Sequence, residues 1–302
     1  MQANWSNPDR DAWDGLHRRV AASLQQDWVY GEALRSLGTP CLRVEFMQAG
    51  QHVGVAQCLV RKVGGMFSLA LCSHGPVWSP ESSSDQRREA IRLFRRSLPL
   101  RWPRVCLLTP DSADAQAEGM VGRIRVVTGH STVRIDLDRT PEAIRAALNG
   151  KWRNRLVAAE RSELKVQRVG TKPAQYRWLL DRELAQRSTR RYIALPDGFV
   201  EAWQAHGGGV LTLRADRSRD AVAGMMFLIH GEAATYQVGW QDDAGRELGA
   251  HNLLLWQGML ALRERGVRRL DLGGVDTVRS SGIARFKIGT GGEVLTLAGT
   301  FF

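Results

Sequence analysis

VRRLDLGGVDTVRSSGIARFKIGTGGEVLTLAGTF, residues 267–301, is the stretch that decides the fold expected for this chain. Residues 267–272 form a short apolar run with two arginines, which is typical of a strand that follows a helix. We expect Gly273 and Gly274 to end this strand, because paired glycines interrupt regular structure. A polar loop over residues 276–281 should follow.

The second part of the same stretch predicts a hairpin. Residues 283–288 carry an Arg and a Lys among apolar side chains, a glycine cluster then turns the chain, and residues 294–297 form a final strand. Alternation along the first strand would bury Phe286 and Ile288 and point Lys287 the other way. A strand, a glycine stop, a polar loop and a hairpin are a common way to build a ligand site at a strand end.

Length and composition bound the class of protein. The chain has 302 residues, of which 43% are hydrophobic, enough for one large or two medium domains. The sequence contains no apolar run approaching the ~18 residues of a transmembrane helix and no secretory signal. The seven His are scattered without metal-ligand spacing. We expect a reduced chain with packed thiols, because no close pair occurs among Cys41, Cys58, Cys72 and Cys106.

The formal net charge is +11 and the pI is about 10.2. Much of the excess is arginine, whose planar guanidinium binds phosphate through two parallel hydrogen bonds. The composition therefore favours an anionic partner. A generally basic, arginine-rich proteome would produce the same balance, so charge alone does not specify a site.

The two halves of the chain resemble each other at an offset of roughly 165 residues, about one domain length. GVAQCLVRK at residues 54–62 is similar to AVAGMMFLI at 221–229, and RVCLLTP from Arg104 is similar to RRLDLGG from Arg268. GRIRVVTGHSTVRIDL from residue 122 is similar to GIARFKIGTGGEVLTL from residue 282. Each half has the pattern of strand, strand, helix, strand and hairpin, which indicates a duplicated domain.

Helical periodicity marks three further segments. Residues 15–37 hold an apolar pattern at helical spacing, and residues 249–265 form a strongly amphipathic helix. Residues 141–164 start with Pro at the first helical position and are interrupted at Gly150. In that last segment basic side chains surround an apolar face, which is typical either of phosphate binding or of a solvated helix surface.

LDLGGVD, GIARFKIGTGGE and the AGTF ending resemble the C-terminal signature of the FemABX family, and KWRNRLVAAER at residues 151–161 resembles its basic helix between two domains. Members of this family transfer amino acids from aminoacyl-tRNA to the peptide of peptidoglycan precursors. The resemblance implies an α+β fold of two tandem GNAT-like domains, each a mixed, mostly antiparallel sheet flanked by helices. We place these domains at residues 1–140 and 141–302, with the basic interdomain helix at 141–164. Residues 176–199 leave no room for a coiled-coil arm.

The resemblance also implies a chemistry and a set of site residues. An acceptor amine would attack the ester carbonyl at the tRNA 3′ end, so the protein must align the reactants and stabilise an oxyanion. Lys287 matches the Lys of the family's Phe-Lys-x-Gly motif and would stabilise the oxyanion. Asp271 or Asp276 could orient the amine, and we expect Asp276 to be the catalytic residue that acts with Lys287. The expected substrate-binding residues are Trp28, Tyr30, Lys151, Arg153, Asn154, Arg155, Tyr192, Tyr236 and Arg285.

Some of these aromatic residues have an equally good structural interpretation. Trp28 and Tyr30 could stack on a ligand or anchor their helix to the sheet. Tyr236 could hydrogen-bond substrate or place its hydroxyl at the sheet edge.

Two other functional classes stay open. A GNAT N-acyltransferase using acyl-CoA or acyl-carrier protein would share the fold and the charge; its phosphate-binding loop would fall at residues 246–251, where His251 stands in place of Gly or Ala. A non-catalytic RNA- or nucleotide-binding protein would not need Lys287.

For the transferase we expect aminoacyl-tRNA as co-substrate without a further cofactor or metal, and a UDP-linked or lipid-linked muramyl peptide as acceptor. We also expect a cytoplasmic monomer that touches membranes only peripherally.

Overall fold

The computed structural model describes residues 1–64, 66–190, 195–278 and 280–302. The chain folds into two compact units. Unit 1 comprises residues 1–131, 198–207 and 295–302, and unit 2 comprises residues 132–197 and 208–294. The units are therefore interleaved in sequence: the last residues of the chain belong to unit 1, whereas a division at residues 140 and 141 would place them in the second domain.

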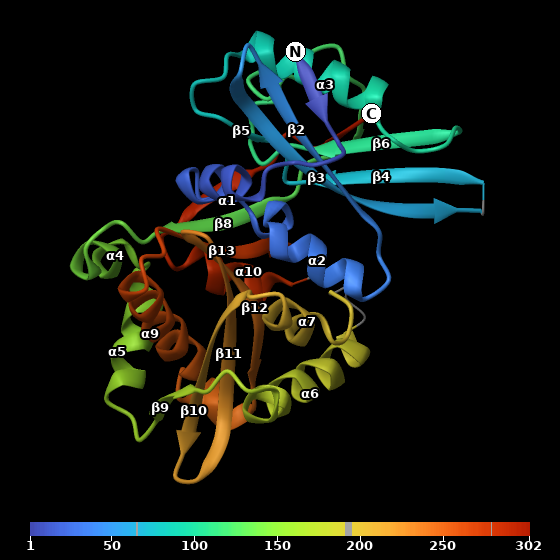
Figure 1. Cartoon of the computed structure of the whole chain (residues 1–302). Helices are drawn as coiled ribbons and strands as arrows, with labels where there is room; N and C mark the ends of the chain where they lie inside the picture. The colour runs from blue at the N-terminus through green and yellow to red at the C-terminus, as the bar shows by residue number, and fades with distance from the viewer. Residues whose placement is uncertain (65, 191–194, 279) are drawn as a thin grey trace. The chain divides into compact units, whose positions relative to one another are not determined.

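Unit 1 is built on a sheet with the strand order β1-β2-β3-β4-β6-β15-β7, with β5 paired to β3 (Figure 1). Its strands are β1 Gln2–Asn4, β2 Cys41–Gln48, β3 Gln51–Val63, β4 Phe67–Ser73, β5 Val77–Trp78, β6 Arg104–Thr109, β7 Arg125–Val127 and β15 Thr300–Phe301. Its helices are α1 Arg10–Arg19, the short 3₁₀ helix η1 Leu24–Gln26, α2 Trp28–Ser36, α3 Ser84–Ser97 and α7 Phe199–Ala205.

Helix α3 covers one face of this sheet. It starts at a capping box, in which the Ser83 hydroxyl accepts from the Gln86 N–H and the Gln86 side chain accepts from the Ser83 N–H. Its apolar stripe, with Ile91 and Phe94 fully buried, packs in one core with Phe46 of β2. The segment over residues 15–37, which holds the helical pattern, falls in two helices, because α1 ends at Arg19 and α2 begins at Trp28.

Unit 2 is built on a sheet with the strand order β14-β8-β13-β12-β11-β10-β9. Its strands are β8 Ser131–Asp136, β9 Lys165–Val169, β10 Gly209–Arg217, β11 Asp220–His230, β12 Ala233–Gln241, β13 Arg269–Val275 and β14 Glu293–Thr296. Its helices are α4 Pro141–Ala147, α5 Gly150–Glu160, α6 Pro173–Arg190, α8 Asp243–Glu247, α9 Ala250–Glu264 and α10 Ser281–Ile288.

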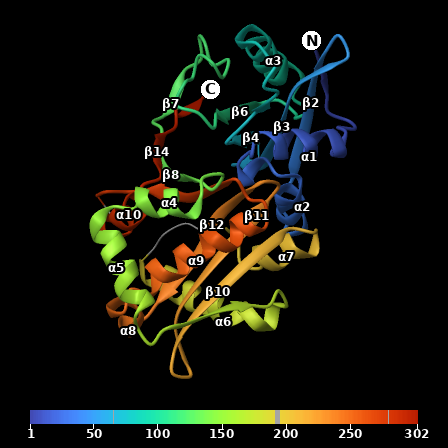
Figure 2. The same ribbon diagram turned by 90° about the vertical axis from the view of Figure 1, so that its left-hand side faces the viewer.

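Helices cover both faces of the second sheet. Figure 2 looks onto α9 in front of strands β10 to β12. A Cβ atom on Gly258 of α9 would lie 2.6 Å from the ring of Phe227 on β11, so glycine permits this close approach. On the opposite face a Cβ on Gly224 of β11 would lie 2.6 Å from Trp178 of α6. Positions 224 and 227 of β11 thus face opposite sides of the sheet, as expected for a strand that is covered by helices on both faces.

Both sheets are mostly antiparallel, and each contains a parallel strand pair, β4 with β6 and β12 with β13. The expected mixed α+β fold is confirmed, and the described segments contain no coiled-coil arm. Within those same segments, no helix is both long and apolar enough to cross a bilayer. All four cysteines are buried free thiols, as expected.

Two predictions for the C-terminal stretch are wrong. Gly273 and Gly274 do not end a strand, because β13 runs through them to Val275. The residues after the loop form helix α10, not the first strand of a hairpin. The reason is packing: Ala284 and Lys287, three residues apart on one helical face, are buried, whereas Ile288 is 41% exposed.

Candidate active site in unit 2

The two parallel strand pairs differ in how far they run together. In unit 1, β4 and β6 pair over six residues, from Ser68 with Arg104 to Ser73 with Thr109. In unit 2, β12 and β13 pair over three residues, from Ala233 with Arg269 to Thr235 with Asp271, although both strands continue. Beyond that point β12 and β13 no longer pair with each other, and the Gly274 carbonyl on β13 accepts a hydrogen bond from a side chain instead.

Lys287 lies beside this divergence. It comes from the last turn of α10 and is 8% exposed. Its ammonium donates a hydrogen bond of 2.9 Å to the carbonyl of Gly274 on β13. It also lies 5.9 Å from the ring centroid of Tyr236, which belongs to β12. Lys287 therefore reaches both diverging strands, and the two predicted residues Lys287 and Tyr236 are brought together.

Burial determines the electrostatics of this ammonium. Loss of solvent lowers the pKa of Lys287 from 10.5 to about 8, and the negative charge of Asp271 partly opposes that change. A buried cation with a depressed pKa is typical of functional sites, because an ordinary structural lysine keeps its charge in water. At neutral pH most Lys287 side chains still carry the charge.

Asp271 is held by the protein itself. Its carboxylate accepts hydrogen bonds from the Thr132 hydroxyl and the Gly273 N–H, both at 2.6 Å, and from Arg134 Nε at 3.3 Å. Gly273 adopts φ +74°, a conformation that favours glycine, and a Cβ there would lie 3.7 Å from the Lys287 ammonium. Asp271 thus acts on Lys287 through its charge.

Helix α10 is fixed in place by α5. Trp152 of α5 donates its indole N–H to the carbonyl of Phe286 at 3.1 Å, and the two rings lie 5.9 Å apart. The N–H of Asn149 donates to the carbonyl of Gly289 at 2.9 Å. Gly289 leaves no space for a larger residue, because a Cβ there would lie 2.8 Å from Trp152 Cδ1. The position of Lys287 therefore depends on residues far away in the sequence.

Asp276 and Arg285 are exposed on the same part of unit 2. The Asp276 carboxylate accepts the N–H of Val278 at 2.9 Å, in the loop that follows β13. Asp276 thereby shapes the loop between β13 and α10, and its role toward an acceptor amine stays a prediction.

The predicted residues of the basic helix, Lys151, Arg153, Asn154 and Arg155, are all exposed on α5. Among them Arg155 also donates to the carbonyl of Arg246. A Cβ on Gly249, just before α9, would lie 3.1 Å from the Arg155 side chain. Helix α5 thus covers the glycine where a GNAT-type loop would bring phosphate to the backbone.

The predicted aromatic residues of unit 1 are part of its packing. Trp28 makes an edge contact with Trp13 at 5.5 Å, and the Arg43 guanidinium lies 3.8 Å from its ring centroid. Tyr30 is 6% exposed, and its ring lies 5.5 Å from Phe199. Tyr192 lies outside the described residues.

His251 is a residue that sequence reasoning did not assign to the site. Its imidazole hydrogen-bonds the backbone of Trp240 on β12, and burial lowers its pKa to about 4, so it is neutral at pH 7. Its ring lies 6.0 Å from that of Phe286, the neighbour of Lys287. Nε2 of His251 is buried without a hydrogen-bond partner among the described residues. The unexpected His in the 246–251 loop was the signal that could have drawn attention to it.

Residues 212–302 match the model of the FemAB family, and this segment contains Lys287, β12, β13 and α10. The match confirms the FemABX resemblance. No curated protein matches the sequence. Among the residues that the structure describes, no group of three or more His, Cys, Asp or Glu is arranged to hold a metal ion.

Solved structures agree with this result at the level of the fold. The structure of FemX matches with a TM-score of 0.81 and 12% identity, over 100% of this chain and 96% of that one. The C-terminal domain of a putative lysylphosphatidylglycerol synthetase from Agrobacterium fabrum matches with a TM-score of 0.56 and 15% identity, over 97% and 92%. A tandem GNAT protein from the clavulanic acid biosynthesis pathway matches with a TM-score of 0.52 and 13% identity, over 99% and 98%. The expected tandem GNAT-like fold is therefore confirmed.

Proposed function

We propose that this protein is an aminoacyltransferase that moves an amino acid from aminoacyl-tRNA to an amine of a peptidoglycan precursor or a related small acceptor. The acceptor would be a UDP-linked or lipid-linked muramyl peptide. The FemAB match supports a transferase of this class. The observation that carries the assignment is Lys287, a buried ammonium at the point where β12 and β13 diverge.

Aminolysis of an ester does not require a covalent intermediate with the protein, because the ester is already activated. The acceptor amine attacks the carbonyl carbon, a C–N bond forms, and the C–O bond to the tRNA ribose breaks. Negative charge develops on the carbonyl oxygen in between, and a fixed cation in a site shielded from water stabilises it strongly. Lys287 supplies that cation. Because the site is already organised around the ammonium, little rearrangement is needed as charge develops.

The reaction also moves protons. The attacking amine must lose one, and the departing ribose oxygen must gain one. His251 can accept a hydrogen bond from the amine, because its imidazole is neutral and its buried Nε2 has no partner in the described part of the chain. Its pKa of about 4 makes it a weak base, so the proton of the amine passes to Lys287 once that residue has given up its own. Lys287, with its pKa near 8, can donate to the departing oxygen. Asp276 would orient the acceptor amine.

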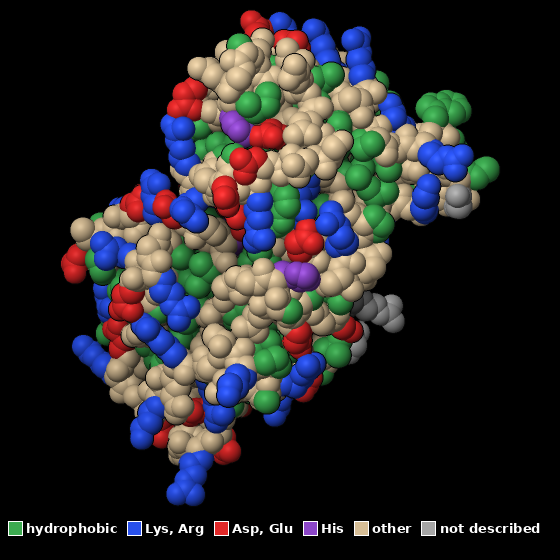
Figure 3. All heavy atoms as spheres, viewed as in Figure 1, with side chains coloured by type: hydrophobic (Ala, Val, Ile, Leu, Met, Phe, Trp, Pro, Cys, Tyr) green, Lys and Arg blue, Asp and Glu red, His purple; other side chains and the backbone are tan. Residues whose placement is uncertain are grey.

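The exposed basic side chains of α5 would contact phosphates of the tRNA, with Lys151, Arg153 and Arg155 as the cations and Asn154 as a hydrogen-bonding partner. Lysine and arginine side chains occur widely over the face shown in Figure 3, in keeping with the net charge of +11. The reaction needs no cofactor beyond its co-substrate. We assign it to the cytoplasm, where charged tRNA is found, and to a monomer.

An acyl-CoA donor fits less well. The backbone at Gly249, where a GNAT loop would receive pyrophosphate, is packed against Arg155 of α5. The N–H groups of Asn252 and Leu253 are both bonded to the Gly249 carbonyl. The start of α9 therefore has fewer free backbone N–H groups for a phosphate than an open glycine loop would have.

The test is transfer activity after removal of the ammonium. Lys287→Ala is expected to lower kcat by about 10²- to 10³-fold, the usual cost of losing one oxyanion partner. Lys165→Ala removes an exposed lysine from β9 of the same unit and should leave turnover unchanged. Thermal unfolding would show that both variants are folded. Unchanged turnover in folded Lys287→Ala protein would reject the assigned role.

A further inference from the structure

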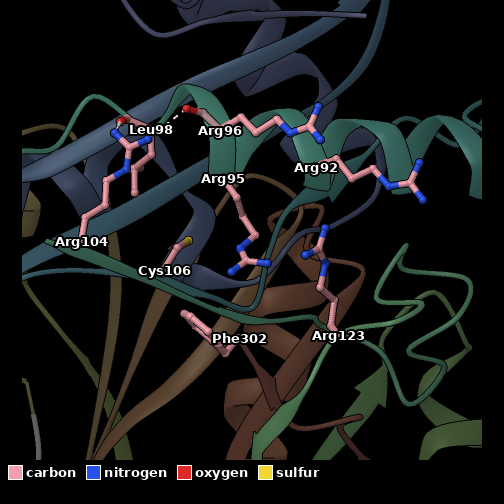
Figure 4. Close-up of a pocket in the computed structure, with 8 residues that line it drawn as sticks. All are labelled: Arg92, Arg95, Arg96, Leu98, Arg104, Cys106, Arg123 and Phe302. Atoms are coloured by element: carbon pink, nitrogen blue, oxygen red, sulfur yellow. Dashed lines mark hydrogen bonds between the residues drawn. The ribbon is translucent and has the colours of Figure 1, made fainter. Parts of the chain in front are cut away.

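A second cationic site lies in unit 1, far in sequence from Lys287. It is a cavity of about 470 Å³ between the end of α3, the strand β6, the segment around Arg123 and the C-terminal residue (Figure 4). It is lined by Arg92, Arg95, Arg96, Leu98, Arg104, Cys106, Arg123 and Phe302. Five of these eight residues are arginines, and this described lining contains no acidic side chain; its one carboxylate is the terminal group of Phe302.

The arginines of α3 differ in whether they have a carboxylate partner. Arg88 forms an ion pair of 2.6 Å with Asp85, and Arg87 lies 3.9 Å from Glu118. The three α3 arginines that line the cavity, in contrast, have no carboxylate partner among the described residues. This group consists of Arg92, Arg95 and Arg96. The cavity thus keeps a net excess of positive charge, because five guanidinium groups face only the one terminal carboxylate of Phe302.

Arg104 has a structural task. Its guanidinium donates to the carbonyls of Leu98, Leu100 and Arg96, at 3.0 Å for the last two, and so closes the end of α3. Arg104 is therefore not available to a ligand in the way the other four arginines are.

Two guanidinium groups face each other across the cavity. In Figure 4 Arg95 extends from α3 toward Arg123, which extends from the opposite wall. Arg95 is positioned by Phe302, whose ring centroid lies 4.8 Å from its guanidinium carbon. Nε of Arg123 is buried and has no hydrogen-bond partner in the described chain. The pKa of Arg123 is lowered by burial, and further by the charges of Arg95 and Arg92.

Like charges placed this close repel each other, and a buried donor without an acceptor costs free energy. Such an arrangement is typical of a site that binds a ligand. Features that lower the stability of the fold are usually found where they serve a function. An anion between Arg95 and Arg123 would remove both costs. Phosphate suits the planar guanidinium fork, which gives two parallel hydrogen bonds to its oxygens.

We propose that this arginine pocket binds a small ligand that carries a diphosphate group, held by hydrogen bonds from Arg95 and Arg123, while Arg92 and Arg96 at the rim add positive charge. Four unpartnered arginines match the charge of a diphosphate better than that of a single phosphate. The volume of about 470 Å³ is that of a small-molecule site. The inference is separate from the role of Lys287, because it uses residues of unit 1 alone, and its ligand class includes the UDP-linked or lipid-linked acceptor of the proposed reaction, which also carries a diphosphate.

The test is calorimetric titration of the full-length protein with inorganic pyrophosphate and inorganic phosphate at constant ionic strength. Pyrophosphate should bind more tightly than phosphate. Arg95→Gln and Arg123→Gln should each weaken pyrophosphate binding by about tenfold or more, since each removes charge-assisted hydrogen bonds. Arg88→Gln removes the same charge from α3 outside the pocket and should leave the affinity unchanged.

Thermal unfolding separates a binding role from a structural one. Without ligand, Arg123→Gln should unfold at the same temperature as the wild type or a higher one, because a repulsive charge is removed. Pyrophosphate should raise the unfolding temperature of the wild type and of Arg88→Gln, but not that of Arg123→Gln. Absence of pyrophosphate binding, an equal loss in Arg88→Gln, or RNA binding that depends on these arginines without pyrophosphate binding would each overturn the proposal.

Discussion

Replacing Lys287 by Met should stabilise the protein while abolishing transfer. The side chain is 8% exposed, and burial lowers its pKa from 10.5 to about 8. Each pKa unit corresponds to about 1.4 kcal/mol, so the buried charge costs the fold roughly 3 kcal/mol at pH 7. Met keeps the apolar stem but loses the hydrogen bond to the Gly274 carbonyl, which offsets roughly 1 kcal/mol. The expected net gain is about 2 kcal/mol.

The pH dependence of this gain identifies its cause. Below about pH 8, Lys287 is charged in both the folded and the unfolded state, and the penalty is present in full. Between about 8 and 10.5 the folded protein loses this proton first, so the unfolded state binds more protons and wild-type stability rises with pH. The advantage of Lys287→Met over the wild type should therefore shrink steadily across that window.

Urea unfolding followed by tryptophan fluorescence at several pH values between 7 and about 10 measures this difference. Other titrating groups occur in both proteins and cancel in the comparison. Lys165→Met, at an exposed position of β9, should change the free energy of unfolding by less than about 0.5 kcal/mol. A destabilised Lys287→Met protein, or a gain that does not vary with pH, would refute the reasoning.

Three further predictions concern the same site. The transfer rate should fall as the pH rises through about 8, where Lys287 loses its proton, and a rate measured for Lys287→Arg should lack that fall because arginine stays charged. Asp271→Asn removes the charge that raises the pKa of Lys287, so the fall should move to lower pH; a midpoint that does not move would contradict this. Gly289→Ala should lower the free energy of unfolding by about 1–3 kcal/mol, because its Cβ would lie 2.8 Å from Trp152; Gly282→Ala, which meets nothing within 4 Å, is the control, and equal effects would count against the packing argument.

Much of the architecture could be predicted from local patterns. The helix expected over residues 249–265 is observed as Ala250–Glu264, because its apolar residues repeat at helical spacing and it ends at a Gly-containing turn. The basic segment after Pro141 is interrupted near Gly150, as predicted, and forms α4 and α5. These features depend on neighbours in the sequence, which periodicity and turn chemistry report directly.

The site could be predicted less completely, because distant residues create it. The motif indicated Lys287, but its burial depends on Trp152, which is separated from Phe286 by 134 residues and bonded to it. A short segment such as residues 281–288 satisfies both strand and helix patterns, and only its packing selects the helix. The arginine pocket joins Arg123 to Phe302 for the same reason, so no local pattern could reveal it.

The central claim is that an aminoacyl ester of tRNA is the donor. Its most direct test offers purified protein a UDP-linked muramyl pentapeptide together with either mixed charged tRNA or acetyl-CoA, and follows the mass of the product. A mass gain of one amino-acid residue that requires charged tRNA and disappears after RNase treatment is the predicted result. Acetylation that requires CoA and is insensitive to RNase would contradict the account.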